Sequence, residues 1–215
     1  MIKHLIWDLD GTLFDTYPAL TEALLAALAD RGHTPEPEVI LGLLLVSMTH
    51  CITSLAEAYQ IPVAEMERGF SSHHARIPYH QQPLNPGARA ACAYIRSLRG
   101  KNVIVTHRPR CSTMDLLNLH GLNPLIDDCI AGDDGYPKKP DPAGMLAVMS
   151  RNLIAPAEGL AVGDRDLDLG AGQAAGLRTC LLGQLDTQIK PDFRVDHLDE
   201  LLEILQRENH IGTAD

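Results

Sequence analysis

Three aspartates lie within eight residues near the start of the chain, in the stretch WDLDGTLFDTYP that runs from Trp7 to Pro18. Asp8 and Asp10 are two residues apart at the end of an apolar run, and Gly11 follows them directly. Two like charges at the end of a buried strand repel each other and cost solvation free energy. A helix cap and a solvated turn would explain them without chemistry. A site for a metal and a phosphate would give both carboxylates a chemical use.

Other polar residues also follow apolar runs. Thr106 comes after KNVIV, Asp164 ends GLAVGD, and GDRDLD adds Asp166 and Asp168. In an open α/β sheet, ligands bind at the edge formed by the carboxyl ends of the strands. At an effective dielectric constant of ~20, two like charges ~4 Å apart cost about 4 kcal/mol, so a carboxylate cluster there requires a cation. Oxygen ligands with few nitrogen or sulfur donors suit Mg²⁺.

The loop GYPKKPDP offers two lysines, Lys138 and Lys139, whose charge could offset such a cluster and a bound phosphate. The pair Asp133 and Asp134, just before this loop, leaves two interpretations open. They either lie near the metal or belong to a solvated loop.

Composition limits the classes of partner. The chain has 18 basic and 28 acidic residues among 215, a formal net charge of −10, which argues against a nucleic-acid or anionic-membrane surface. No stretch approaches the ~20 apolar residues that span a bilayer. The five cysteines form no CxxC pair and are scattered, which is typical of buried thiols in a reducing compartment. We therefore expect a cytoplasmic protein that binds neither nucleic acid nor membrane.

Five short apolar runs predict β-strands, and helical patterns lie between them. The runs cover residues 2–7, 101–107, 127–134, 159–164 and 177–182. Several are continuously apolar, which is typical of strands buried on both faces of a parallel sheet. Alternating strands and helices predict an α/β fold with a doubly wound parallel sheet.

One interval breaks this alternation. Residues 16–83 contain four helix-like segments and no convincing strand, and QQPLNPG then punctuates the chain. We expect a four-helix cap domain at 16–83, inserted into a core made of residues 1–15 and 84–215. The cap also contains the polar residues Ser47, Thr49 and His50. They either contact the leaving group of a substrate and so select it, or simply cap a helix.

DLDGTLFDT, Thr106, KKPDP and GDRDLD, in this order, resemble the four motifs of phosphatases of the haloacid dehalogenase (HAD) superfamily. The resemblance covers essentially the whole chain. The helical insertion is similar to the small cap of the phosphoglycolate-phosphatase-like branch. The resemblance implies a Rossmann-like core and a Mg²⁺-dependent phosphatase. Its substrate would be a small phosphomonoester, such as a phosphoglycolate-like metabolite, hydrolysed through an aspartyl-phosphate intermediate.

The resemblance also implies roles for four catalytic residues. Asp8 is the nucleophile that takes the phosphoryl group, and Asp10 protonates the leaving oxygen and then activates water. Thr106 hydrogen-bonds the phosphate oxygens. Lys139, the lysine directly before PDP, offsets the charge of the phosphate and of Asp8. Positioning and charge neutralisation are what phosphoryl transfer requires of a protein.

The implied metal site holds Mg²⁺ through the Asp8 carboxylate, the Asp10 backbone carbonyl and Asp164. Asp168 supports the metal's surroundings.

Two positions depart from the family pattern. The second motif reads THR where a small or amide residue commonly follows the threonine, which makes His107 or Arg108 a candidate substrate contact. The fourth reads GDR where GDS is commoner, which leaves Arg165 without a role.

Three alternatives remain open from the sequence. A sugar phosphomutase of the β-phosphoglucomutase type would return the phosphoryl group to its substrate. A non-enzymatic phosphate-sensing or protein-binding domain would be supported by loss of Asp10, Lys139 or Asp164, and all three are present. GAGQAAG superficially matches a dinucleotide-binding loop, but it does not directly follow a strand, so small residues that pack a helix onto the sheet are favoured.

Overall fold

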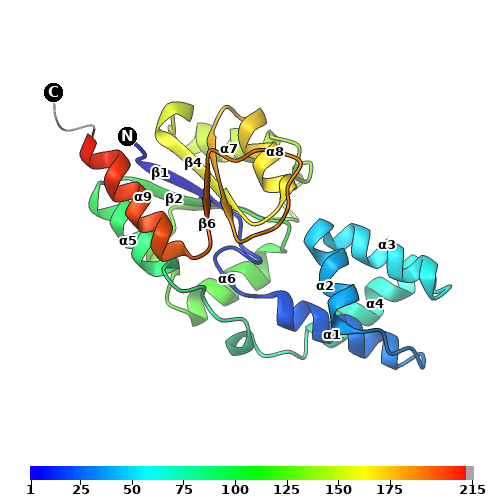
Figure 1. The fold of residues 1–215 in the computed structure, drawn as a ribbon. Helices are drawn as coiled ribbons and strands as arrows, with labels where there is room; N and C mark the ends of the chain where they lie inside the picture. The colour runs from blue at the N-terminus through cyan, green and yellow to red at the C-terminus, as the bar shows by residue number, and fades with distance from the viewer. Residues whose placement is uncertain (212–215) are drawn as a thin grey trace. The chain divides into compact units, whose positions relative to one another are not determined.

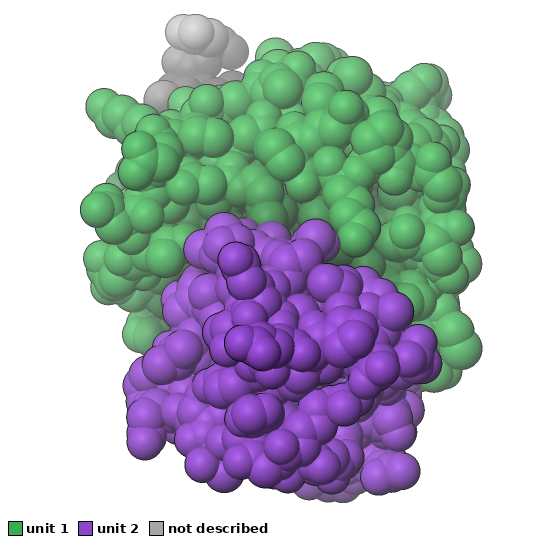
Figure 2. Space-filling model, turned by 90° about the vertical axis from the view of Figure 1, so that its right-hand side faces the viewer, with its two compact units in different colours: residues 1–14, 84–215 green, residues 15–83 purple. Residues whose placement is uncertain are grey.

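The computed structural model describes residues 1–211, and Figure 1 shows their fold. The chain divides into two compact units, one made of Met1–Phe14 and Leu84–Asp215 and the other of Asp15–Pro83. Figure 2 colours the two units separately.

The first unit contains a six-stranded parallel sheet within the described residues, with the strand order β3-β2-β1-β4-β5-β6. The strands are β1 (His4–Trp7), β2 (Lys101–Val105), β3 (Asp128–Ile130), β4 (Gly159–Gly163), β5 (Arg178–Leu182) and β6 (Phe193–Val195). From β1 the chain winds outward through β2 and β3, then returns to the other side of β1 through β4. This order confirms the expected α/β fold with a doubly wound parallel sheet. It also places the topological switch point, where open α/β sheets bind ligands, between β1 and β4.

Each of the five apolar runs contains a strand, whereas β6 was not expected from the sequence. The central strand β4 is buried along its whole length, which explains its continuous apolar sequence. β6 is only three residues long and includes the exposed Arg194, so it has no apolar run to reveal it.

Helices cover both faces of the sheet (Figure 1). Helix α7 packs on β2 and β3 and α8 on β4 and β5, while α5 packs on β1 and β2 and α9 on β6. The helices of this unit are α5 (Ala88–Ser97), α6 (Arg110–Leu119), α7 (Ala143–Asn152), α8 (Asp166–Ala174) and α9 (Leu198–Ile211), with short 3₁₀ turns at Asn123–Leu125 and Pro156–Glu158. The apolar core under α7 and α8 includes Ile6, Val103, Val105, Ile130, Met145, Val148, Ala161 and Ala171.

The small residues of GAGQAAG pack α8 closely against the sheet. A Cβ atom on Gly172 would lie 2.8 Å from Ala161 Cβ and 2.9 Å from Thr179 Cγ2, closer than side-chain carbons approach each other. The stretch therefore serves helix packing, as favoured over a dinucleotide-binding loop.

The second unit is helical, and its helices enclose a core of their own. They are α1 (Tyr17–Ala29), α2 (Pro37–Val46), α3 (Met48–Ala58) and α4 (Val63–His74), followed by a 3₁₀ turn at Tyr79–Gln81. Its core is formed by Leu20, Leu24, Leu28, Ile40, Leu44, Ile52, Leu55 and Met66 with their neighbours. Ser47 is the N-cap of α3, and its Oγ accepts a hydrogen bond from the backbone N–H of His50 at 3.0 Å. The simple capping role thus accounts for Ser47.

Within residues 1–211, none of the helices combines the length and the hydrophobicity that crossing a bilayer requires.

Candidate active site

The sheet brings two sequence-distant aspartates to one edge. β1 ends at Trp7 and β4 ends at Gly163, so Asp8 and Asp164 directly follow two strands that are neighbours. The register pairs Trp7 with Val162, and the Asp8 N–H extends this pairing by donating to the Val162 carbonyl at 2.9 Å. Both carboxylates therefore lie at the switch point of the sheet.

Asp168, in the first turn of α8, completes a cluster of three buried carboxylates. One oxygen of each of Asp8, Asp164 and Asp168 lies within 4.8 Å of the others. The three residues are only 3%, 6% and 2% exposed. Gly163 makes this approach possible, because a Cβ atom there would lie 2.2 Å from Asp168 Cβ.

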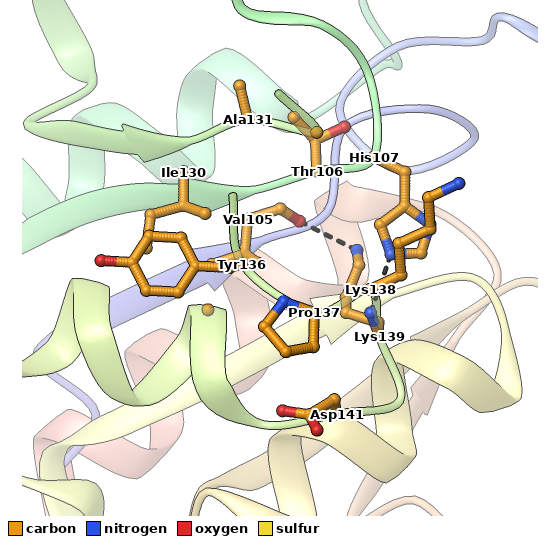
Figure 3. A pocket seen from close by; sticks show the side chains of 12 residues that line it. Val105, Thr106, His107, Ile130, Ala131, Tyr136, Pro137, Lys138, Lys139 and Asp141 are labelled. Carbon is orange, nitrogen blue, oxygen red and sulfur yellow. Dashed lines mark hydrogen bonds between the residues drawn. The ribbon is translucent and has the colours of Figure 1, made fainter. Parts of the chain in front are cut away.

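Lys139 lies inside this cluster, and Lys138 is exposed. The Lys139 ammonium donates to Asp8 Oδ1 at 2.5 Å, to Asp168 Oδ1 at 2.6 Å and to the Val105 carbonyl at 2.9 Å. Its side chain is 2% exposed. Figure 3 shows Lys139 Nζ reaching the Val105 carbonyl. The structure thus places Lys139, the lysine favoured from the sequence, against the Asp8 and Asp168 carboxylates.

Burial and charge act against each other on these groups. Burial raises the pKa of Asp8, to about 7, and the charges of Lys139 and Arg165 oppose this rise. Burial by itself would also raise the pKa of Asp168 and lower that of Lys139. For both groups the opposite charge nearby outweighs burial, so the pKa of Asp168 is lowered and that of Lys139 is raised. Lys139 therefore stays charged beside Asp8, and it opposes the effect of burial on the Asp8 carboxyl.

The Asp10 carboxylate is held by Arg108. Arg108 Nη2 lies 2.8 Å from Asp10 Oδ1, and Nε lies 3.0 Å and 3.3 Å from the two carboxylate oxygens. The Arg108 side chain is 4% exposed and that of Asp10 is 20% exposed. A guanidinium that contacts a carboxylate through two of its nitrogen atoms fixes the orientation of that carboxylate.

Thr106 and His107 follow β2, the neighbour of β1 on its other side. Thr106 is buried, and its Oγ1 accepts from the Arg108 backbone N–H at 3.1 Å. His107 Nε2 accepts from the Lys139 backbone N–H at 2.9 Å (Figure 3), which places the proton of the neutral ring on Nδ1. Burial, together with the charges of Lys139 and Arg165, lowers the pKa of His107 to about 3. The neutral His107 ring therefore positions the lysine loop, and its contact with a substrate stays a prediction.

Sequence reasoning gave Thr12 no role, yet it lies in the site. It is fully buried, and its hydroxyl donates to Asp164 Oδ1 at 3.1 Å, with Asp8 Oδ2 at 3.5 Å. The left-handed turn at Gly11, with φ of 83°, brings the chain back so that Thr12 reaches both carboxylates. The threonine of DGT was the signal that could have revealed this contact.

Asp133 and Asp134 contact Arg110 at the start of α6. Asp133 Oδ1 accepts from the Arg110 backbone N–H at 2.8 Å, and Asp134 accepts from the Arg110 side chain. The observed partners of this pair are thus a helix start and an arginine.

The hollow behind Thr106, His107 and Lys139, drawn in Figure 3, has a volume of about 10 Å³. That is the space of a single water molecule, so it does not accommodate a phosphorylated metabolite.

The carboxylate cluster fits a divalent cation. Its donors are oxygen atoms from three buried side chains within 4.8 Å of one another, and hard oxygen ligands suit Mg²⁺. The Asp10 carboxylate belongs to the ion pair with Arg108, and a backbone-carbonyl role for Asp10 stays a prediction.

A sequence profile of the haloacid dehalogenase-like hydrolase family matches residues 5–182, and the chain belongs to this family. A phosphoglycolate phosphatase of Cupriavidus necator is 30% identical over 180 residues, covering 81% of this chain and 78% of that protein. One from Cereibacter sphaeroides is 29% identical, covering 94% and 97%. The crystal structure of CbbY from Rhodobacter sphaeroides in complex with phosphate is 21% identical, covers 94% of this chain and 96% of that one, and superposes with a TM-score of 0.75.

The comparisons confirm the expected HAD membership and the expected class of enzyme, a phosphoric monoester hydrolase. They favour this class over a non-enzymatic phosphate-sensing domain.

Proposed function

We propose that this protein is a Mg²⁺-dependent phosphatase that hydrolyses a small phosphomonoester through a phosphorylated Asp8. The observation that carries the proposal is the Lys139 ammonium, which contacts the Asp8 and Asp168 carboxylates inside a buried three-carboxylate cluster. Relatives named phosphoglycolate phosphatases support a phosphoglycolate-like substrate.

In the first step an Asp8 oxygen attacks phosphorus. The bond from phosphorus to the leaving oxygen breaks, and Asp10, which enters this step as its protonated carboxyl, donates that proton to the leaving oxygen. In the second step the Asp10 carboxylate takes a proton from water, whose oxygen attacks the phosphorus bonded to Asp8. The bond from phosphorus to Asp8 breaks, and inorganic phosphate leaves.

The surrounding residues orient these groups and balance their charge. Lys139 offsets the charge of Asp8 and of the transferred phosphoryl oxygens, and Thr106 is placed at the same sheet edge to hydrogen-bond them. Asp8, Asp164 and Asp168 would hold the Mg²⁺ ion, with the Asp10 carbonyl as a further ligand. When bound, Mg²⁺ supplies positive charge that stabilises the developing charge on the phosphoryl oxygens.

The helical unit Asp15–Pro83 is proposed to serve as the cap that selects the leaving group. Because Ser47 already caps α3, Thr49 and His50 are the better candidates for this selection. Substituting either by alanine should lower kcat/KM for a physiological phosphomonoester more than for p-nitrophenyl phosphate, whose leaving group needs little help. Equal losses on both substrates would assign these residues to folding.

The central experiment measures phosphate release from p-nitrophenyl phosphate by the purified protein. We expect turnover in Mg²⁺, loss of turnover in EDTA and recovery when Mg²⁺ is restored. Full activity in EDTA would contradict the metal proposal. A screen of phosphorylated metabolites, read by phosphate release, should then identify the substrate. Transfer to a sugar phosphate without phosphate release would favour the phosphomutase.

A further inference from the structure

Arg165 lies against all three carboxylates of the cluster. Its Nη2 is 3.8 Å from Asp8 Oδ2, and its Nε is 3.8 Å from Asp164 Oδ1 and 3.9 Å from Asp168 Oδ2. The side chain is 10% exposed, so these distances are spanned largely outside bulk water. The attraction between the guanidinium and the carboxylates is therefore weakly screened.

Local structure fixes Arg165 in this place. It is the N-cap residue of α8, and its backbone N–H donates to Asp168 Oδ2 at 3.3 Å. The preceding residue, Asp164, directly follows the central strand β4, and Asp168 is on the first turn of α8. The arginine that departs from the family pattern is thus held between two of the carboxylates by the backbone itself.

Lys139 and Arg165 together offset the negative charge of the three carboxylates. Lys139 contacts Asp8 and Asp168 closely, and Arg165 reaches Asp164 in addition. Three carboxylates facing two cations leave one net negative charge. A divalent cation entering this cluster meets a much smaller negative charge than the three aspartates alone would present, and it is repelled by Arg165 at short range.

We propose that Arg165 is a built-in counter-ion that stabilises the cluster without metal and weakens its affinity for Mg²⁺. The inference rests on the proposed function in one respect, namely that the cluster binds Mg²⁺. Arg165 balances the charge of the carboxylates when no metal is bound, and in doing so it competes with Mg²⁺ for them. The metal therefore binds less tightly and is released more readily.

The test combines Mg²⁺ titration calorimetry with thermal unfolding of the full chain, both without substrate and at constant ionic strength. Arg165→Met removes the charge and keeps most of the side-chain length. We expect its Kd for Mg²⁺ to fall about tenfold or more. In EDTA its Tm should fall by about 3 °C or more, because the carboxylates lose a counter-ion. In saturating Mg²⁺ this deficit should vanish or reverse.

Three further variants separate charge from packing. Arg165→Lys keeps the charge and should bind Mg²⁺ as weakly as the native protein. Arg165→Gln provides a polar second variant should Arg165→Met fail to fold. Lys138→Met removes the same charge from an exposed neighbour of the cluster and should leave the Kd within twofold of the native value.

The results distinguish a failure of the Arg165 inference from a failure of the proposed function. A native protein that binds Mg²⁺, with an unchanged Kd in Arg165→Met and Arg165→Gln, would overturn this inference and leave the proposed function intact. The same Tm deficit in EDTA and in Mg²⁺ would also overturn it, since a residue with only a packing role gives that pattern. If neither native protein nor variants bind Mg²⁺, both proposals fail.

Discussion

Arg108 donates two hydrogen bonds to the same Asp10 carboxylate oxygen, from Nε at 3.0 Å and from Nη2 at 2.8 Å. Both side chains project from loops that directly follow neighbouring strands, Arg108 after β2 and Asp10 after β1. The residue assigned to proton transfer is therefore oriented by a charged partner 98 positions away. A side chain that must point at a leaving oxygen benefits from such support, because small misplacements of catalytic groups are costly.

Arg108→Gln should impair substrates with poor leaving groups more than activated ones. Loss of the guanidinium frees the Asp10 side chain to adopt other rotamers, and only a poor leaving group depends strongly on the proton that Asp10 donates. We expect kcat/KM to fall about 10-fold or more for an alkyl phosphate and only a few-fold for p-nitrophenyl phosphate. The measurement is the ratio of the two values in native protein and variant, with Arg108→Lys as the control for charge without the two-pronged contact. Equal losses on both substrates would assign Arg108 to folding.

The substitutions Asp8→Asn and Asp10→Asn should have different effects on turnover. Asp8→Asn should abolish turnover, because an amide is not a nucleophile toward phosphorus. Asp10→Asn should slow turnover by about 10²–10⁴-fold, the usual loss for a general acid–base group. Rapid-quench labelling with a ³²P-phosphomonoester should detect phosphorylated protein for Asp10→Asn and none for Asp8→Asn. Native rates in either variant would refute the assigned roles.

The two adjacent lysines form a matched pair. Lys139→Met should lower kcat by more than about 100-fold, the scale seen when a group that stabilises transition-state charge is removed. Lys138→Met should change kcat less than about twofold, because Lys138 is exposed while Lys139 contacts Asp8 at 2.5 Å. Circular dichroism should accompany the assay, since removing Lys139 leaves two carboxylates in need of compensation. A larger effect of Lys138→Met would reverse the assignment.

His107 should make stability depend on pH between about 3 and 6.5. Its pKa is lowered to about 3 in the folded protein from a usual value of 6.5, so in that window the unfolded chain takes up a proton that the native state does not. Stability from this group is complete above pH 6.5 and declines as the pH falls toward 3. The free energy of unfolding, measured with urea, should fall from pH 7.5 to pH 5. This fall should be smaller in His107→Gln than in the native protein, by up to about 2 kcal/mol. Glutamine retains an acceptor for the Lys139 N–H, and an identical pH dependence in both proteins would contradict this account.

The sequence by itself determined the class of the fold and the edge of the sheet that carries the site. Continuous apolar runs that end in Asp8, Thr106 and Asp164 reveal buried strands with polar residues at their carboxyl ends, since burial on both faces excludes polar side chains within the strands. Small residues in GAGQAAG likewise predicted close helix packing. The short strand β6 escaped, because three residues with a central arginine carry no periodic signal.

Tertiary structure decided which of these residues meet. Chain order does not reveal that β1 and β4 are neighbours, and that pairing places Asp8 beside Asp164. The contact of Lys139 with Asp8 joins residues 131 positions apart, and the ion pairs of Arg108 with Asp10 and of Arg165 with Asp8 are also non-local. Such contacts depend on strand order and on rotamers fixed by packing. Periodicity and motif spacing record which faces are buried, but not which charged side chains share a buried space.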